Sequence, residues 1–114
     1  MFKLAENGII TVNAGDTFKV PLYIFFNNDE VYNVEETDKI YFSLTEPQQS
    51  FYHGLVRKEL FLDKHDKDIY LEFRPEDTEN LHPGTYYYEI KLQRFVEGQE
   101  YISTIIPKRK FILL

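Results

Sequence analysis

The sequence predicts an all-β fold, either an antiparallel sandwich or a barrel. Three observations support this prediction. Apolar and polar residues alternate in one segment after another, which is the pattern of a strand with one buried face. Turn signals separate these segments at intervals of about 10 to 15 residues, as is typical of sandwiches and barrels. Alternation on one face also favours antiparallel pairing over a parallel sheet that is buried on both sides.

The first half of the chain carries two clear strand patterns. In segment 17–26 every second residue from Phe18 onwards is apolar, a period of two that helical spacing does not fit. The polar run 27–30 then supplies turn chemistry. Segment 39–45 repeats the alternation before Pro47 ends it, because proline cannot donate to a sheet ladder.

The second half adds further strands and one short helical turn. Pro75 is followed by acidic residues, which suit the positive end of a helical turn, so a single turn is predicted over 75–81. With the first half, this gives about seven or eight strands. The strands predicted here are 55–62, 69–73, 86–92, 100–106 and 110–114. The aromatic residues expected in the core are Phe18, Phe26, Phe42, Phe73, Tyr86 and Tyr88.

Length and composition exclude several classes of protein. The 114 residues suit one domain, and we expect a single domain over 1–114. The chain has no cysteine, which excludes disulfide scaffolds and cysteine-based zinc sites. With 19 acidic and 13 basic residues the net charge is −6, which argues against a nucleic-acid partner. Segment 1–6 lacks the apolar stretch of a secretory signal, and no apolar run is long enough to span a membrane, so we expect synthesis in the cytoplasm and no membrane insertion.

The residues that could carry chemistry do not form a catalytic pattern. His53, His65 and His82 lie in three different predicted loops, without the pairwise spacing of metal ligands. No serine stands in a Gly-x-Ser-x-Gly elbow, and the five glycines are isolated, so there is no phosphate-binding loop. We therefore expect a non-enzymatic protein with no catalytic residue, no cofactor and no metal.

Two acidic clusters leave alternatives open. Asp63, Asp66 and Asp68 are expected in a solvated turn, since two lysines interrupt them and their spacing differs from that of a calcium loop. Calcium ligation there is the alternative. Segment 29–38 is expected as a solvated connection or an edge hairpin whose charge discourages edge-to-edge pairing. The alternative for this segment is an acidic surface that contacts a partner.

One motif favours a sandwich over a barrel. Leu81, Pro83, Gly84 and Tyr86 place an apolar residue, a tight turn and a tyrosine at the start of a strand. This is the spacing of a tyrosine corner, in which the hydroxyl bonds to upstream backbone between the two sheets. A Pro-Gly turn before an ordinary aromatic strand is the alternative interpretation.

The end of the chain is the first place to expect a partner. Residues 107–110 contain the one basic cluster, and an apolar segment follows. Segment 107–114 is either a last core strand or a strand that docks on a neighbouring subunit. The middle tyrosine of 86–88 must face the other side of its strand, where aromatic rings favour interfaces. The residues of this possible interaction surface are Tyr87, Phe111, Ile112, Leu113 and Leu114.

Several motifs follow one another along the chain. They are Gly8-Ile9-Ile10-Thr11-Val12, Ala14-Gly15-Asp16-Thr17-Phe18, Asp38-Lys39-Ile40-Tyr41-Phe42-Ser43, Tyr70-Leu71-Glu72-Phe73, Arg74-Pro75-Glu76-Asp77-Thr78, and Leu81-His82-Pro83-Gly84-Thr85-Tyr86-Tyr87-Tyr88-Glu89-Ile90. In this order the chain resembles small proteins encoded by phages and prophages of Gram-positive bacteria, over about residues 8–106. It differs from them at Glu89, where aspartate is common, and in its basic and apolar end.

The resemblance implies an immunoglobulin-like β-sandwich that serves as a virion component, made in the host cytoplasm. Such modules occur in tails, baseplates, connectors and capsid decorations, where they bind other virion proteins or adhere weakly to cell-surface glycans. For this chain we expect a homo-oligomer or assembly on a particle with other virion proteins. Gly15 and Gly84 carry over as turn residues and Tyr86 as the corner tyrosine, and no catalytic residue carries over. The alternative is a glycan-binding module for cell-surface polysaccharide, which needs two or three exposed aromatics on one face, Tyr87 among them.

Overall fold

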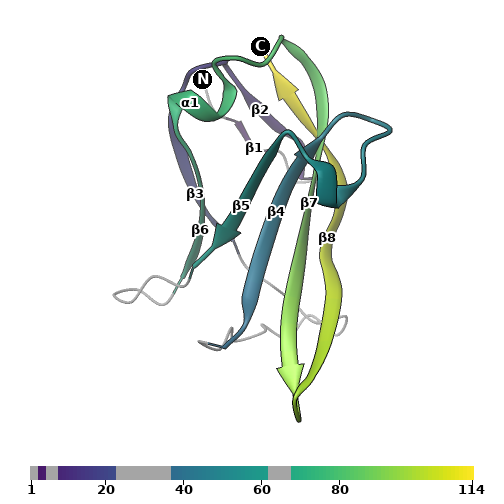
Figure 1. Ribbon diagram of the computed structural model, residues 1–114. Helices are drawn as coiled ribbons and strands as arrows, with labels where there is room; N and C mark the ends of the chain where they lie inside the picture. The colour runs from purple at the N-terminus through teal and green to yellow at the C-terminus, as the bar shows by residue number, and fades with distance from the viewer. Residues whose placement is uncertain (1–2, 5–7, 23–36, 62–67) are drawn as a thin grey trace.

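The computed structural model describes residues 3–4, 8–22, 37–61 and 68–114, and over these residues the chain is all-β, as predicted (Figure 1). The helical turn expected after Pro75 is present as a single short helix. Residues 23–26, the end of one predicted strand, lie outside the described residues. The elements are β1 (Lys3–Leu4), β2 (Ile10–Val12), β3 (Phe18–Leu22), β4 (Lys39–Thr45), the 3-10 turn η1 (Phe51–His53), β5 (Val56–Leu60), β6 (Ile69–Phe73), α1 (Pro75–Thr78), β7 (Gly84–Val96) and β8 (Gln99–Leu113).

The strands form a large and a small sheet. The large sheet has the order β1-β2-β8-β7-β4-β5, and the small one pairs β3 with β6. The expectation of a purely antiparallel fold is wrong at one place, because β2 runs parallel to β8, with Ile10 opposite Phe111 and Val12 opposite Leu113. Three residues of alternating burial look the same in either direction, so the sequence pattern of β2 could not specify it.

The core lies between the two sheets and is rich in aromatic rings. Phe73 of the small sheet packs edge-on against Phe42 and stacks on Phe111, both of the large sheet, with 5.4 Å between ring centroids in each pair. Five of the six predicted core aromatics are buried, which confirms them, and Phe26 lies outside the described residues. Aromatic pairs at this spacing add to the stabilisation that burial alone gives.

The β7–β8 hairpin is longer than the sheet it belongs to. Its strands have 13 and 15 residues, whereas β4 accompanies β7 only as far as the pair Lys39 and Gln93. Beyond that pair the hairpin extends past the lower end of β4 (Figure 1). Glu97 and Gly98 both have positive φ and join Val96 to Gln99, which is the backbone of a two-residue hairpin turn matched to the twist of its strands.

Candidate functional site

The tyrosine corner predicted at the start of β7 has the expected hydrogen bond. The Tyr86 hydroxyl donates to the backbone carbonyl of His82 over 2.6 Å, while the ring is buried. Leu81 packs against the core, and Gly84 begins β7 directly after the turn. The corner therefore fixes where β7 enters the sheet.

The next inward tyrosine, Tyr88, also bonds back across the molecule. Its hydroxyl donates to the backbone carbonyl of Gly8, in the segment before β2. Burial raises the pKa of the Tyr88 hydroxyl above its ordinary value, and the positive charge of Arg109 acts in the opposite direction. The phenol is therefore neutral at physiological pH and remains a hydrogen-bond donor.

The C-terminal strand fills the protein's own core. Phe111 and Leu113 are buried, because alternation turns every second residue of β8 inward between β2 and β7. These two side chains, expected as part of a docking surface, are thus occupied within the same chain. Ile112 is half-buried and Leu114 is exposed, although the backbone of Leu114 bonds to Val12 and Ala14.

Within the described ranges, Tyr87 does not join an aromatic cluster. It is half-buried on the outer face of β7, opposite Lys110 and Thr45, and its backbone carbonyl accepts a hydrogen bond from the Thr45 hydroxyl. The structure therefore places Tyr87 on one face of the large sheet and Phe111 and Leu113 on the other. The interaction residues predicted from sequence do not form one surface.

A site that the sequence analysis did not predict lies on the outer face of the large sheet. The segment after β4 folds back so that η1 covers part of this face. The buried Ser43 hydroxyl donates to the Phe51 carbonyl over 2.6 Å, and the Leu55 amide donates to the Leu44 carbonyl over 2.7 Å. These two bonds fix η1 against β4.

The close approach of this loop requires a glycine. A Cβ atom on Gly54 would lie 2.0 Å from the Ser43 hydroxyl oxygen and 2.9 Å from the Leu44 carbonyl oxygen. Any other residue would force η1 away from the sheet, since packed interiors do not yield by that much without cost. The absence of a Cβ atom at Gly54 thus allows η1, which forms the wall of the site, to lie close against β4.

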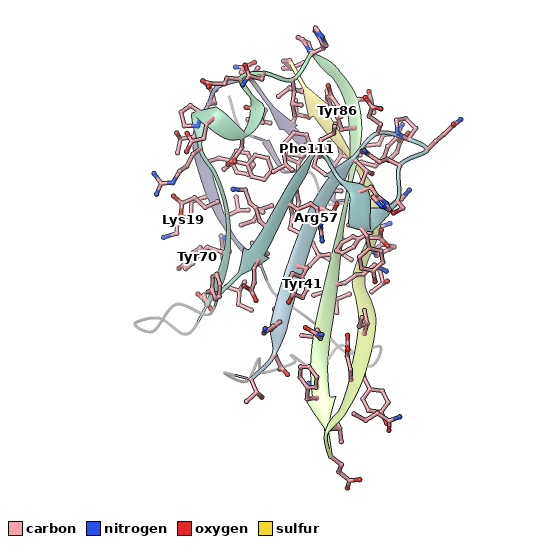
Figure 2. The ribbon with its side chains drawn as sticks, in the orientation of Figure 1. Lys19, Tyr41, Arg57, Tyr70, Tyr86 and Phe111 are labelled. Atoms are coloured by element: carbon pink, nitrogen blue, oxygen red, sulfur yellow. The ribbon has the colours of Figure 1, made fainter. Side chains whose placement is uncertain are left out.

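Between η1 and the β7–β8 hairpin this arrangement leaves a cleft of about 270 Å³. Tyr41 and Arg57, both labelled in Figure 2, come from β4 and β5 on its floor. The remaining lining residues come from η1, β7 and β8. The full lining is Tyr41, Phe51, Tyr52, Arg57, Lys91, Gln93, Glu100 and Ile102. We call this site the outer-face cleft.

A chain of hydrogen bonds orders the polar side of the outer-face cleft. The Tyr41 hydroxyl donates to Gln93 Oε1 over 3.3 Å, and Gln93 Nε2 donates to Glu100 Oε1 over 2.8 Å. Because the amide of Gln93 bonds on both sides, its orientation is fixed. One row of polar groups therefore crosses three neighbouring strands.

The two cations of the cleft differ in their surroundings. Lys91 Nζ lies 5.2 Å from the centroid of the Phe51 ring, donates to the Thr104 hydroxyl over 3.0 Å and is 3.7 Å from a carboxylate oxygen of Glu89. Arg57 is exposed, and within the described part of the chain its guanidinium makes no hydrogen bond or ion pair. Of the two lining cations, Arg57 is the one that remains available to a ligand.

A second cavity, of about 370 Å³, lies where β5 faces β6. Its charges are largely paired: Lys58 contacts the carboxylate of Asp77 at 2.8 Å, and Arg74 contacts that of Glu72 at 3.3 Å. Nearby, Lys19 lies 4.4 Å from the centroid of the Tyr70 ring (Figure 2). Both basic side chains that line this cavity therefore already have a carboxylate partner.

The far end of the β7–β8 hairpin, residues 94–102, carries four large apolar side chains that are exposed to solvent. Phe95 and Ile102 are diagonal neighbours on one face, and Val96 and Tyr101 are diagonal neighbours on the other. Their exposed fractions lie between 45% and 52%. We call this segment the hairpin end.

The remaining sequence candidates do not converge. Asp38 forms an ion pair with Arg94 at 3.5 Å, whereas 29–36, Asp63, Asp66 and His65 lie outside the described residues. His53 Nδ1 lies 3.0 Å from the Ser50 hydroxyl oxygen, a contact within the turn of η1. In the described ranges, no three His, Asp or Glu side chains gather in a way that would hold a metal ion, and no helix is long and apolar enough to cross a membrane.

The chain was compared with protein-family models, with curated proteins and with solved structures, and none of them matches it. Among the described residues, the outer-face cleft and the hairpin end are the two candidate sites considered below. The first is concave and polar on one side, and the second is projecting and apolar.

Proposed function

We propose that this protein is a non-enzymatic structural component of a phage particle, an immunoglobulin-like β-sandwich that acts by binding copies of itself and other virion proteins. The order of the strands supports the fold. In immunoglobulin domains strands C, F and G share a sheet, B and E share the other, and a tyrosine corner lies at the start of F. Here β4, β7 and β8 share a sheet, β3 and β6 share the other, and Tyr86 lies at the start of β7.

The position two residues after the corner tyrosine gives further support. In antibody domains this position holds a cysteine that bridges the sheets. Here it holds Tyr88, whose buried ring stacks on Phe42 with 5.9 Å between centroids. Aromatic packing thus takes the place of a disulfide, which suits a domain that folds in a reducing cytoplasm.

The observation that best supports the proposed function is the exposed apolar surface of the hairpin end. A two-stranded ribbon is at best marginally stable in water unless a further layer covers it. The hairpin end exposes an apolar pair on each of its faces, so that a protein partner would bury surface on both. Aromatic and aliphatic side chains that become fully buried supply most of the binding free energy at interfaces.

Charge favours a second copy of the same chain as the partner. The hairpin end carries Glu97 and Glu100, whereas the opposite end of β8 carries the exposed basic run 108–110. The acidic end of one molecule therefore complements the basic end of the next. Such a head-to-tail contact uses two different surfaces and generates rings or filaments, which are the assemblies expected of a tail or connector component.

The oligomeric state of the purified protein tests this proposal. We expect multi-angle light scattering to show a mass that rises with protein concentration, and the assembly to weaken in high salt because exposed charges are screened. Phe95→Ser should reduce assembly. Phe61→Ser is the matched control, since Phe61 is an exposed phenylalanine outside the hairpin end.

Two results would contradict the proposal. The wild-type protein could remain monomeric at every concentration up to its solubility limit. Alternatively, Phe61→Ser could weaken assembly as much as Phe95→Ser, which would exclude the hairpin end as the contact. Circular dichroism of each variant verifies that the fold is retained.

A further inference from the structure

We infer that the outer-face cleft binds an acidic saccharide, a sugar ring that bears a carboxylate group. This site goes beyond the proposed assembly function; it shares Glu100 and Ile102 with the hairpin end, so the inference concerns the protein before it assembles. The inference starts from the construction of the cleft. Its wall is held by the Ser43 bond to Phe51 and by Gly54, so that the cleft exists before a ligand arrives.

The size and lining of the cleft suit a sugar ring better than a folded segment. Its volume of about 270 Å³ lies just below the range of about 300–1,000 Å³ found for drug-sized ligands. Tyr41 and Tyr52 supply aromatic surface for the C–H groups of a pyranose, and the Tyr52 ring is fixed edge-on against Phe51 at 5.2 Å. Rigid aromatic rings give contact area at low cost in conformational entropy.

The polar groups of the cleft are complementary to neighbouring hydroxyl groups. Gln93 holds one carboxylate oxygen of Glu100, so the second oxygen can accept a hydrogen bond from a ligand. The Tyr41 hydroxyl lies at the other end of the same row. A ring with adjacent hydroxyls offers donors and acceptors at that spacing, whereas an apolar ligand would leave these groups unpaired at a cost.

Arg57 selects for a carboxylate. Lys91 is already neutralised by Glu89 and bonded to Thr104, which leaves Arg57 as the lining cation without a partner among the described residues. A guanidinium binds a carboxylate through two parallel hydrogen bonds and is suited to this recognition. An otherwise acidic protein thus presents an available positive charge beside two tyrosine rings.

The experiment is a titration of ¹⁵N-labelled protein with galacturonic acid oligomers, followed by NMR. Saturable shift changes are expected at amides of Tyr52, Arg57 and Gln93, with little change for neutral galactose oligomers of the same length. Arg57→Gln should weaken binding at least about tenfold, as loss of a charged hydrogen bond predicts. Lys58→Gln is the matched control, because Lys58 is the next residue of β5 and pairs with Asp77 on the other side.

Tyr52→Ala is a second variant with its own expectation. Tyr52 is 52% exposed, so its removal should leave the fold intact while weakening binding about tenfold, which is the upper part of the range for one aromatic contact. Neutral oligomers that bind as well as acidic ones would overturn the inference. So would shifts that acetate alone reproduces, or binding that Arg57→Gln leaves unchanged.

Discussion

Side chains alternate between the two faces of the sheet at both ends of the β7–β8 hairpin, but other strands cover one end and not the other. The near end is where β7 begins and β8 ends, and the other is the hairpin end defined above. At the near end, Tyr86 and Tyr88 on β7 and Phe111 on β8 are buried, with β2 and β4 alongside and the small sheet facing them. At the hairpin end, Phe95 and Tyr101 are about half exposed on strands that have gone past β4. Alternation therefore shows that a strand has two faces, but it does not show whether either face is covered.

The largest loss of folding stability is expected from a substitution at the near end of the hairpin. Phe111→Ala removes a ring that is fully buried and stacked on Phe73, which should destabilise the protein by about 3–5 kcal/mol. Urea unfolding measures the loss, and a variant that no longer unfolds cooperatively also fulfils the prediction. Leu114→Ala, three residues later and exposed, should change stability by less than about 0.5 kcal/mol.

A second effect concerns the loop that lies on the outer face between the two ends. Gly54→Ala should cost about 1–3 kcal/mol, because the added methyl group overlaps the Ser43 hydroxyl. Ser43→Ala alone should cost about 1 kcal/mol through the lost hydrogen bond to Phe51. The double variant should be more stable than the sum of the two losses predicts, since the alanine at 43 gives the methyl group room. Strict additivity in urea unfolding would contradict the packing described for η1.

Two neighbouring tyrosines at the start of β7 allow the hydrogen bond of the tyrosine corner to be tested. Tyr86→Phe keeps the buried ring and removes the hydroxyl bonded to His82, so we expect a loss of about 1 kcal/mol. Tyr87→Phe is the matched control at the next residue, where no hydrogen bond of the hydroxyl is found within the described ranges, and it should be close to neutral. Equal losses for the two variants would show that the corner bond does not stabilise the near end.

The pH dependence of stability provides a smaller, directional test. Since the pKa of Tyr88 is raised in the folded protein, the unfolded chain releases this proton first as the pH rises. The contribution is fully present below the pKa of an unfolded tyrosine, about 10, and declines above it. Tyr88→Phe should therefore flatten the fall in stability between mildly and strongly alkaline pH, measured by thermal melts. An unchanged slope would contradict the burial of the hydroxyl.

The smallest effect is expected at the hairpin end. Phe95→Ser should change the free energy of unfolding by less than about 0.5 kcal/mol when measured at a dilution where the protein is monomeric. A loss comparable to that of Phe111→Ala would mean that the hairpin end is packed within the chain and not available to a partner.

Much of the fold could be predicted because its signals are local. The alternation around Phe42 and Phe73 identified both strands and their inward faces, and the Pro-Gly turn identified the corner at Tyr86. The parallel pairing of β2 could not be predicted, since three alternating residues carry no information on direction. The end of β8 was ambiguous for a related reason: its apolar residues suit a core or a partner equally well.

The outer-face cleft could not be predicted because its residues are distant in sequence and none of them, taken alone, indicates a binding site. Tyr41, Lys91 and Gln93 are the outward residues of their strands, a position typical of solvated side chains. Two adjacent aromatics, Phe51 and Tyr52, in an otherwise polar loop were the available signal. Their meaning depends on the fold-back of η1, which rests on a hydrogen bond and a glycine contact that no periodicity reveals.

The parallel pairing of β2 with β8 also determines when the protein can fold during its synthesis. Ile10 lies opposite Phe111, so β2 must wait for a strand that is made much later along the chain. Until β8 has left the ribosome, β2 and β7 both lack a neighbour and expose their apolar faces. Closing so large a loop is slow and costly in chain entropy. The domain is thus open to aggregation or to a chaperone until β8 has been made.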